Sequence, residues 1–307
     1  AIYTNTTGSH NNALGRAALY SNTTGANNTA LGSDALYTNT TGSHNVAIGL
    51  NALETANASN NVSIGVDSGR LSTTGTPNVF IGRSTGESNT TGTYNVAVGA
   101  YALDASQTVS YNVAIGVNAL GSQTTGYRNV SVGNAAGDSI TTGYRNTCIG
   151  DIAGEVLTTG NDNTIIGYNA QAAAVDSTNS FTFGDANISS IRCNTTSIRS
   201  LSDVRDKTDI VDLPLGINFL NTLRPVKFKW QRRIPDQNDG KIRAGFIAQE
   251  LQTAQSECNY LNLVLEDNPD KLEATPGNLI PVLVNAIKEL SAKNTALENR
   301  IAVLELA

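Results

Sequence analysis

The sequence predicts a mainly β fold in two parts: a β-solenoid shaft of 17-residue repeats, followed by a small α+β domain that ends in a helix. One short unit recurs through the first part of the chain, and the composition changes near residue 200. The first 200 residues contain no lysine and one proline, whereas the last 107 contain the only tryptophan, Trp230, and six of the seven prolines. We therefore expect a shaft over residues 1–190, a linker over 191–201, a domain over 202–278 and a helix over 279–307.

The repeat unit is Asn-x-x-apolar-Gly, with glycines spaced by 17 residues except for one interval of 16, and a degenerate last copy ends at Gly184. This length is too short for a helix pair or a propeller blade. Each unit holds a β-favouring run, such as Val46 to Ile48, and a weaker one, such as Ala35 to Tyr37, between turn-forming Asn and Gly residues. Two short strands and two turns per unit predict about 11 coils of a β-solenoid.

The apolar residue before each repeat glycine is predicted to form the core, and the repeat asparagines to form a hydrogen-bonded ladder. Alanines three residues after the glycines leave room for close backbone approach. One apolar ladder per coil is a thin core, so we expect other copies to complete it, most simply three chains around one axis. The alternative is a monomeric solenoid with a two-ladder core. The predicted core ladder is Leu14, Leu31, Ile48, Ile64, Ile81, Val98, Ile115, Val132, Ile149 and Ile166, and the alanines include Ala18, Ala35, Ala52, Ala102 and Ala119.

The unit Asn-x-Ala-Ile-Gly, as at Asn45 to Gly49, resembles the head repeats of trimeric autotransporter adhesins, the shafts of phage tail fibres and repeat-rich surface proteins of marine bacteria. This resemblance implies an architecture and says little about a ligand. Asn-x-Ser/Thr triplets, such as that at Asn129, are explained by the turns of the repeat rather than by glycosylation. Four tyrosines just before the repeat asparagines could stack on sugars or fill space between coils: Tyr94, Tyr111, Tyr127 and Tyr144.

Charge and composition exclude several classes of function. The net charge of -6 gives no electrostatic case for nucleic acid, and no apolar run approaches the length of about 18 residues that membrane insertion needs. Three cysteines without a CxxC pair, and two histidines in the same Ser-His-Asn context, indicate neither a metal site nor a disulfide framework, and we expect no cofactor. The chain lacks methionine, so we expect it to be a piece of a longer protein.

A serine and a lysine five residues apart, Ser202 and Lys207, stand where the composition changes. A serine hydroxyl needs a base to become a nucleophile, and no histidine follows residue 44, so a Ser-His-Asp triad is excluded in this part. A lysine can be that base when its amine is neutral, which burial or a neighbouring cation favours. By spacing alone such a pair is usually a solvated turn.

Three ordered motifs give this pair a context. They are Ser202, Asp203, Arg205, Lys207 and Ile210, then Leu223 to Trp230, then Gly245 to Leu251. They resemble the intramolecular chaperone auto-processing domain of phage tail spikes and fibres, first known from endosialidases. The resemblance implies one self-cleavage beside Ser202, with Ser202 as nucleophile, Lys207 as base, and Asp203, Arg205 and Ile210 as support. Whether the bond before or after Ser202 is cut stays open.

The third motif reads as a buried strand running into a helix, where Gly245 allows close packing and the Gln249 side chain could bond a backbone group. Its residues Gly245, Phe246, Ala248 and Gln249 are expected to maintain the fold rather than to catalyse. Between the second and third motifs, Arg232 to Lys241 is expected to be an exposed hairpin or loop.

The C-terminal residues show a heptad pattern with Pro281 at the helix start. The pattern predicts a trimeric coiled coil that gathers the chains and aligns their registers, with polar Asn294 fixing register and strand number. The alternative is an amphipathic helix packed on its own domain. Positions a are Ile280, Ile287, Asn294 and Ile301, and positions d are Leu283, Leu290, Leu297 and Leu304.

We therefore expect a homotrimeric fibre or adhesin segment, on a virion or a cell surface, with a host-cell glycan or another surface receptor as its partner. Its single-turnover cleavage would be maturation. One alternative is a tail spike that degrades glycans, but the scattered acids Asp34, Glu54, Asp67, Glu87 and Asp104 form no repeated pair of carboxylates. Others are a bacterial surface repeat protein with the same chaperone, and a membrane-tethered regulator, which would need a transmembrane helix or a DNA-binding domain.

Overall fold

The computed structural model describes residues 1–185, 188, 202–231, 240–266 and 272–306. The chain forms two compact units, Ala1–Ile188 and Ser189–Ala307. The expected linker over residues 191–201 lies outside the described residues. Among the helices in the described ranges, none combines the length and apolar character that crossing a bilayer requires.

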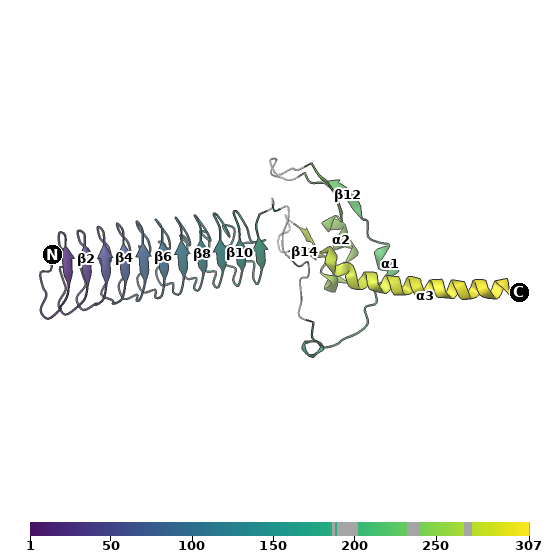
Figure 1. The fold of residues 1–307 in the computed structure, drawn as a ribbon, viewed down its shortest axis with the longest axis horizontal. Coiled ribbons are helices and arrows are strands. Elements are labelled where there is room, and N and C mark those ends of the chain that lie inside the picture. The colour runs from purple at the N-terminus through teal and green to yellow at the C-terminus, as the bar shows by residue number, and fades with distance from the viewer. Residues whose placement is uncertain (186–187, 189–201, 232–239, 267–271, 307) are drawn as a thin grey trace. The chain divides into compact units, whose positions relative to one another are not determined.

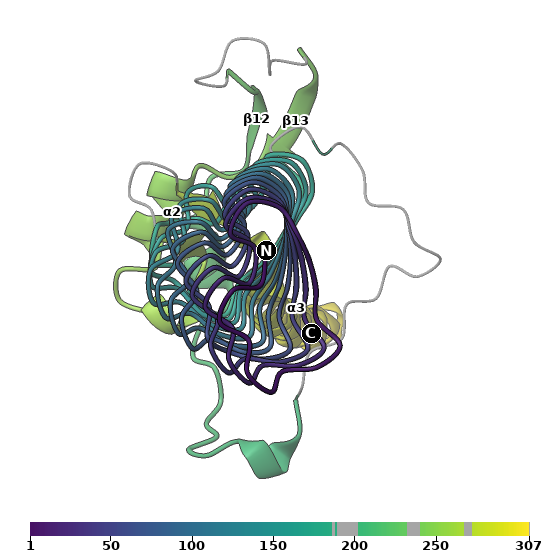
Figure 2. The same cartoon turned by 90° about the vertical axis from the view of Figure 1, so that its left-hand side faces the viewer.

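The first unit is a parallel β-solenoid with one three-residue strand in each coil (Figure 1). Its 11 strands pair in sequence order, with Leu14 opposite Leu31 and, at the shorter interval, Val46 opposite Val62. Successive coils trace nearly the same outline when viewed along the stack (Figure 2), so the predicted solenoid is confirmed. The strands are β1 (Asn12–Leu14), β2 (Thr29–Leu31), β3 (Val46–Ile48), β4 (Val62–Ile64), β5 (Val79–Ile81), β6 (Val96–Val98), β7 (Val113–Ile115), β8 (Val130–Val132), β9 (Thr147–Ile149), β10 (Thr164–Ile166) and β11 (Phe181–Phe183).

The second β-favouring run of each unit forms a turn. The backbone of Leu36 has a φ of 53°, and Leu103 and Leu120 have the same left-handed conformation. A strand needs negative φ at its residues, so the expected second strand in each coil is wrong. The left-handed turn instead directs these leucines into the core, where all three are fully buried.

The middle residue of each strand points into the solenoid. Ala47 and Ala114 are fully buried, whereas Ile115 is 39% exposed and Leu14 is 70% exposed. The prediction that the residues before glycine form the core is therefore wrong. Side chains alternate between the two faces of a strand, so a small residue facing inward leaves both larger neighbours facing outward. The alanines expected to lie close to neighbouring backbone are fully buried: Ala18, Ala35, Ala52, Ala102 and Ala119.

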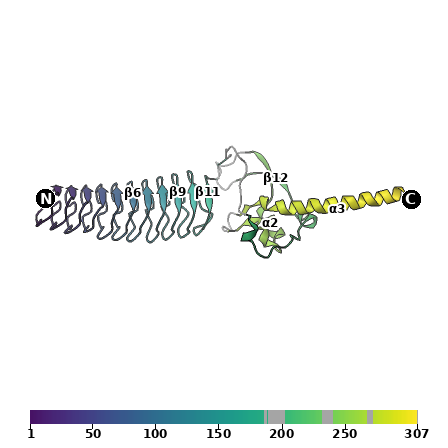
Figure 3. The same ribbon diagram turned by 60° about the horizontal axis from the view of Figure 1, so that its bottom comes forward.

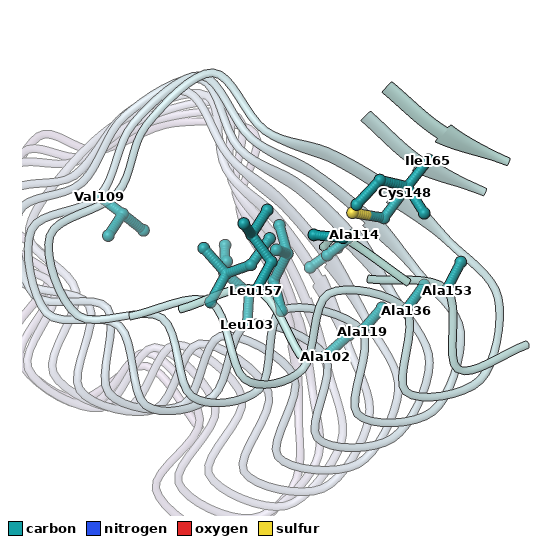
Figure 4. Packing of buried hydrophobic residues seen from close by; sticks show 14 of the residues in the cluster. Ala102, Leu103, Val109, Ala114, Ala119, Ala136, Cys148, Ala153, Leu157 and Ile165 are labelled. Atoms are coloured by element: carbon teal, nitrogen blue, oxygen red, sulfur yellow. The ribbon is translucent and has the colours of Figure 1, made fainter. Parts of the chain in front are cut away.

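In several coils, the buried strand residue and the residue six positions later complement each other in size, whereas both are small in others, such as Ser131 and Gly137. Ala114 is followed by Leu120, whereas Phe80 is followed by Gly86, where an added β-carbon would lie 2.5 Å from the Phe80 ring. Figure 4 shows Ala114 and Leu103 in one interior cluster. A single chain thus has two ladders of inward side chains, which is the core expected under the alternative of a monomeric solenoid. Its larger outward residues stay uncovered.

The repeat asparagines lie buried just before the strands and form the expected ladder. Asn28 Oδ1 accepts from the backbone N–H of Asn45 at 3.0 Å and from its Nδ2 at 3.1 Å. The backbone bond recurs in each following coil up to Asn163, so each amide joins two successive coils.

The second unit is a small α+β assembly, as predicted. An antiparallel hairpin consists of β12 (Val226–Lys229) and β13 (Ile242–Gly245), and β14 (Val264–Leu265) pairs with β15 (Glu273–Ala274). Residues 232–239 lie outside the described residues, so the exposed loop expected from Arg232 to Lys241 stays a prediction.

The helices of this unit surround a separate core, and α3 extends as one long helix (Figure 3). They are α1 (Ile217–Leu220), α2 (Ala248–Ala254) and α3 (Ile280–Glu305), with short 3-10 turns η1 (Val204–Asp206), η3 (Asn259–Leu261) and η4 (Pro276–Leu279). The largest core residues are Phe219, Leu251, Leu263, Leu279 and Val282.

Candidate functional site

A short 3-10 turn brings the serine and the lysine of the first motif together. Asp203 caps η1, and its side chain accepts from the backbone N–H of Arg205 at 2.9 Å. The turn ends at Lys207, whose backbone N–H donates to the carbonyl of Val204 at 3.2 Å. This folding places Lys207 Nζ 2.6 Å from Ser202 Oγ, within hydrogen-bond range.

Arg205 and Asp203 form a second pair in the same turn. The guanidinium donates to both carboxylate oxygens of Asp203, with Nε 3.0 Å from Oδ1. These bonds to Arg205 lower the pKa of the Asp203 carboxyl, which keeps the carboxylate charged. Because Asp203 is engaged by Arg205, it is not the partner of Lys207, and the lysine amine is directed at Ser202 instead.

The Ser202 and Lys207 side chains are both exposed in the single chain. A lysine acts as a base only when its amine loses its proton, and removal from water favours that loss. The two side chains are therefore in contact, but none of the described residues covers the lysine amine. Ile210, the apolar residue that ends the motif, is 65% exposed and its neighbour Val211 is 83% exposed.

The third motif forms part of the hairpin and helix of the second unit, and no described contact joins it to Ser202. As predicted, a strand runs into a helix: β13 ends at Gly245 and α2 begins at Ala248. The strand is half-exposed, so its expected burial is wrong, because it lies in a two-stranded hairpin. A β-carbon on Gly245 would stand 3.2 Å from the ring of Phe228, and Phe246 packs against the core. Gln249 is exposed, and its side chain has no hydrogen bond among the described residues.

Helix α3 has two faces with different roles. Val282 and Ala286 are buried against the core of the unit, and Glu289 Oε2 accepts from the backbone N–H of Ile217 at 3.0 Å. The heptad residues lie on another face, and Ile287, for example, is 64% exposed. The described residues of the unit therefore leave the apolar seam exposed, whereas a helix packed on its own domain along this face would bury it. The exposed seam residues are Ile280, Leu283, Ile287, Leu290, Asn294, Leu297, Ile301 and Leu304.

Two of the scattered acids of the shaft, Asp34 and Glu87, are held by arginines. Asp34 pairs with Arg16 and Glu87 with Arg70, one coil apart in each case. Among the described residues, no group of three or more His, Cys, Asp or Glu side chains could hold a metal ion. The sequence-based predictions did not include Arg128, which contacts Tyr111 and Tyr127, or Arg145, which contacts Tyr144. Arg128 lies 17 residues after Tyr111 and Arg145 lies 17 residues after Arg128, and this repeat spacing is the signal that could have identified them.

The comparisons with known proteins bear on the second unit alone. No curated protein and no solved structure matches the chain. The region of the Ser202 and Lys207 pair, residues 202–260, follows the β-solenoid and matches the model of the family described as chaperone of endosialidase.

Proposed function

We propose that the chain is part of a homotrimeric fibre, of the tail-fibre or tail-spike kind, that serves attachment to a surface. Its C-terminal unit aligns three chains and then releases itself by cutting the chain beside Ser202. The observation that carries the proposal is the 2.6 Å contact between Lys207 Nζ and Ser202 Oγ at the start of the region that matches the chaperone family.

The cut requires Ser202 Oγ to act on a neighbouring carbonyl carbon. If that carbonyl belongs to Leu201, the Oγ proton passes to Lys207 and the oxygen attacks, so that the peptide becomes an ester while the amine of Ser202 takes up a proton. Water then hydrolyses the ester and leaves a carboxylate on Leu201. A cut after Ser202 is the other possibility, and the fragment masses distinguish the two.

Assembly would complete the site. The two side chains are exposed in one chain, and the apolar Ile210 and Val211 beside them are also exposed. A second chain that covers this region would remove Lys207 from water and so favour the neutral amine that a base needs. Cleavage would then follow trimerisation, which is the order that a removable chaperone requires.

Two uncovered apolar surfaces support the trimer. One is the seam of α3. The other, which we call the outer face, consists of the first and third residues of strands β3 to β8, and all of them are Val or Ile. A continuous apolar stripe of this length on a solvent-facing sheet is typical of an interaction surface. The outer face comprises Val46, Ile48, Val62, Ile64, Val79, Ile81, Val96, Val98, Val113, Ile115, Val130 and Val132.

The repeat explains why such a shaft needs a chaperone. Because consecutive coils are nearly alike, two chains displaced by one coil would lose few contacts, and the register is only weakly specified by the shaft itself. A C-terminal coiled coil with one polar seam position, Asn294, fixes the register before the shafts join. Once the unit is removed, the closed shaft would be kinetically trapped.

The test is the intact mass of the purified full chain and of its Ser202→Ala variant, under denaturing and native conditions. The parent should yield two fragments whose masses add to the full chain plus one water, and Ser202→Ala should stay whole. Ser256→Ala changes another exposed serine of the same unit and should be cut like the parent. Cleavage of Ser202→Ala at the parent position would refute the proposed role of Ser202.

A further inference from the structure

We propose that a ladder of aromatic and arginine side chains on the outside of the shaft binds an acidic sugar of a surface glycan. The proposal rests on the attachment role proposed above and adds the place and the class of ligand. The ladder consists of Tyr94, Tyr111, Arg128, Tyr127, Tyr144 and Arg145.

The ladder is continuous over four coils. Tyr94 stacks on Tyr111 and Tyr127 on Tyr144, with ring centroids 5.0 Å apart in both pairs. Arg128 joins the two pairs, because its guanidinium carbon lies 5.7 Å from the ring centroids of both Tyr111 and Tyr127. Arg145 lies 4.7 Å from the centroid of Tyr144. At about 4.8 Å per strand, three coil intervals extend about 15 Å, long enough for a short oligosaccharide.

Three of the four tyrosines of the ladder are open to solvent, and Tyr144 is half-buried. Tyr94 is 54% exposed, Tyr111 52% and Tyr127 39%. Their hydroxyls form no hydrogen bond with the described residues. Stacking covers the ring faces, so the ring edges and the hydroxyls are the parts left for a ligand. A sugar can pack its C–H groups on those edges while its own hydroxyls bond the phenols.

Arg128 supplies the charge that the ligand must complement. Of the five arginines in the shaft, three pair with acids, and Arg145 of the ladder is one of them, bonded to Asp162 at 2.6 and 2.7 Å. Arg128 pairs with no described carboxylate and is exposed between two rings. A stacked guanidinium keeps its N–H edge free, and that edge matches a carboxylate with two parallel hydrogen bonds.

The charge of the shaft favours a sugar acid over a dense polyanion. Residues 1–188 hold five arginines against eleven acidic residues, which repels nucleic acid. One unpaired guanidinium flanked by neutral phenols instead suits one carboxylate flanked by neutral hydroxylated rings. Uronic and sialic acids within a glycan have this chemistry.

The experiment measures binding of the purified full chain to immobilised oligosaccharides that carry uronic or sialic acid, each beside a copy with its carboxylate reduced to an alcohol. At least one acidic oligosaccharide should bind. Reduction of its carboxylate should weaken binding by about tenfold or more, which corresponds to the loss of a charge-assisted hydrogen bond. Arg128→Gln should weaken binding to the same member as strongly. Arg83→Gln is the matched control, because exposed Arg83 lies over the single ring of Tyr101 at 5.6 Å, outside the ladder.

Native mass measurements on the same samples separate this proposal from the proposed assembly. A parent chain that binds the acidic sugar as a single copy contradicts the trimer and leaves the ladder site standing. If the chain binds none of the acidic oligosaccharides, the proposed glycan site is refuted. It is also refuted if binding survives Arg128→Gln. If Arg128→Gln instead changes the copy number, the ladder is a contact between chains and the glycan site is refuted.

Discussion

The side-chain oxygen of Asn95 accepts two hydrogen bonds from Asn112, which lies one coil further along the shaft. The backbone N–H of Asn112 lies 3.1 Å from Asn95 Oδ1, and its Nδ2 lies 3.2 Å away. Asn112 Oδ1 in turn accepts from the backbone N–H of Asn129 at 2.9 Å. One amide per coil thus satisfies buried backbone donors that the strand pairing leaves unused.

Asn112→Ala should destabilise the shaft by about 1–3 kcal/mol, because the buried N–H of Asn129 would lose its acceptor. Thermal or denaturant unfolding of the full chain measures the change. Gln107→Ala changes an exposed side chain that forms no hydrogen bond with the described residues, and it should alter stability by less than about 0.5 kcal/mol. Equal effects of the two changes would mean that the asparagine ladder contributes no stability.

Gly86→Ala should destabilise the shaft by about 2–4 kcal/mol. The residue has a φ of 58° and its new β-carbon would lie 2.5 Å from the Phe80 ring, so backbone strain and overpacking add. The double change Phe80→Ala with Gly86→Leu should be more stable than either Phe80→Ala or Gly86→Leu, because it recreates the Ala97 and Leu103 pair of the next coil. A double-mutant cycle from unfolding curves checks this, and simple additivity would contradict the size complementarity.

Ile115→Asp should break the trimer while the solenoid stays folded, since Ile115 belongs to the outer face and lies outside the core of its own chain. Native mass spectrometry reports the copy number and circular dichroism the fold. Thr108→Asp places the same charge on an exposed turn residue and should leave the trimer intact. A trimer that tolerates Ile115→Asp would remove the outer face from the interface.

Ile287→Asp combined with Leu290→Asp should prevent both trimerisation and cleavage, although the Ser202 and Lys207 pair is unchanged. The pair is exposed in one chain, and under the proposed assembly a second chain covers it. The fraction of cut chain on a denaturing gel measures the effect. Ala292→Asp adds a charge at the exposed position opposite the seam and should leave cleavage normal. Full cleavage in the seam variant would mean that one chain suffices.

Cys148 makes stability depend on pH in the alkaline range. Burial raises the pKa of its thiol from the usual 9.0 to about 12. Between those values the unfolded chain releases a proton that the folded chain keeps, so stability falls as pH rises from about 9 towards 12, by roughly 1 kcal/mol per pH unit. Cys148→Ala should show a shallower decline in unfolding free energy over this window. Identical slopes would indicate that the thiol ionises in the folded shaft.

The sequence by itself determined the period, the parallel stacking and the place of the Ser202 and Lys207 pair. These features are local or strictly repeated: a 17-residue spacing returns the chain to the same point of each coil, and a five-residue spacing is closed by a single capped turn. Heptad spacing likewise placed Ile287 and Leu290 on one helix face.

Only the tertiary structure decided which face of each strand is inside. Hydrophobicity favoured Ile115 as a core residue, yet Ala114 faces inward, because the space within a coil is already filled by Leu120 from the following turn. The turn propensity of leucine does not reveal that it adopts a left-handed turn here. The match in size between a small strand residue and a large turn residue exists only once the coil closes. The same closure turns the larger residues outward, where they remain partly exposed.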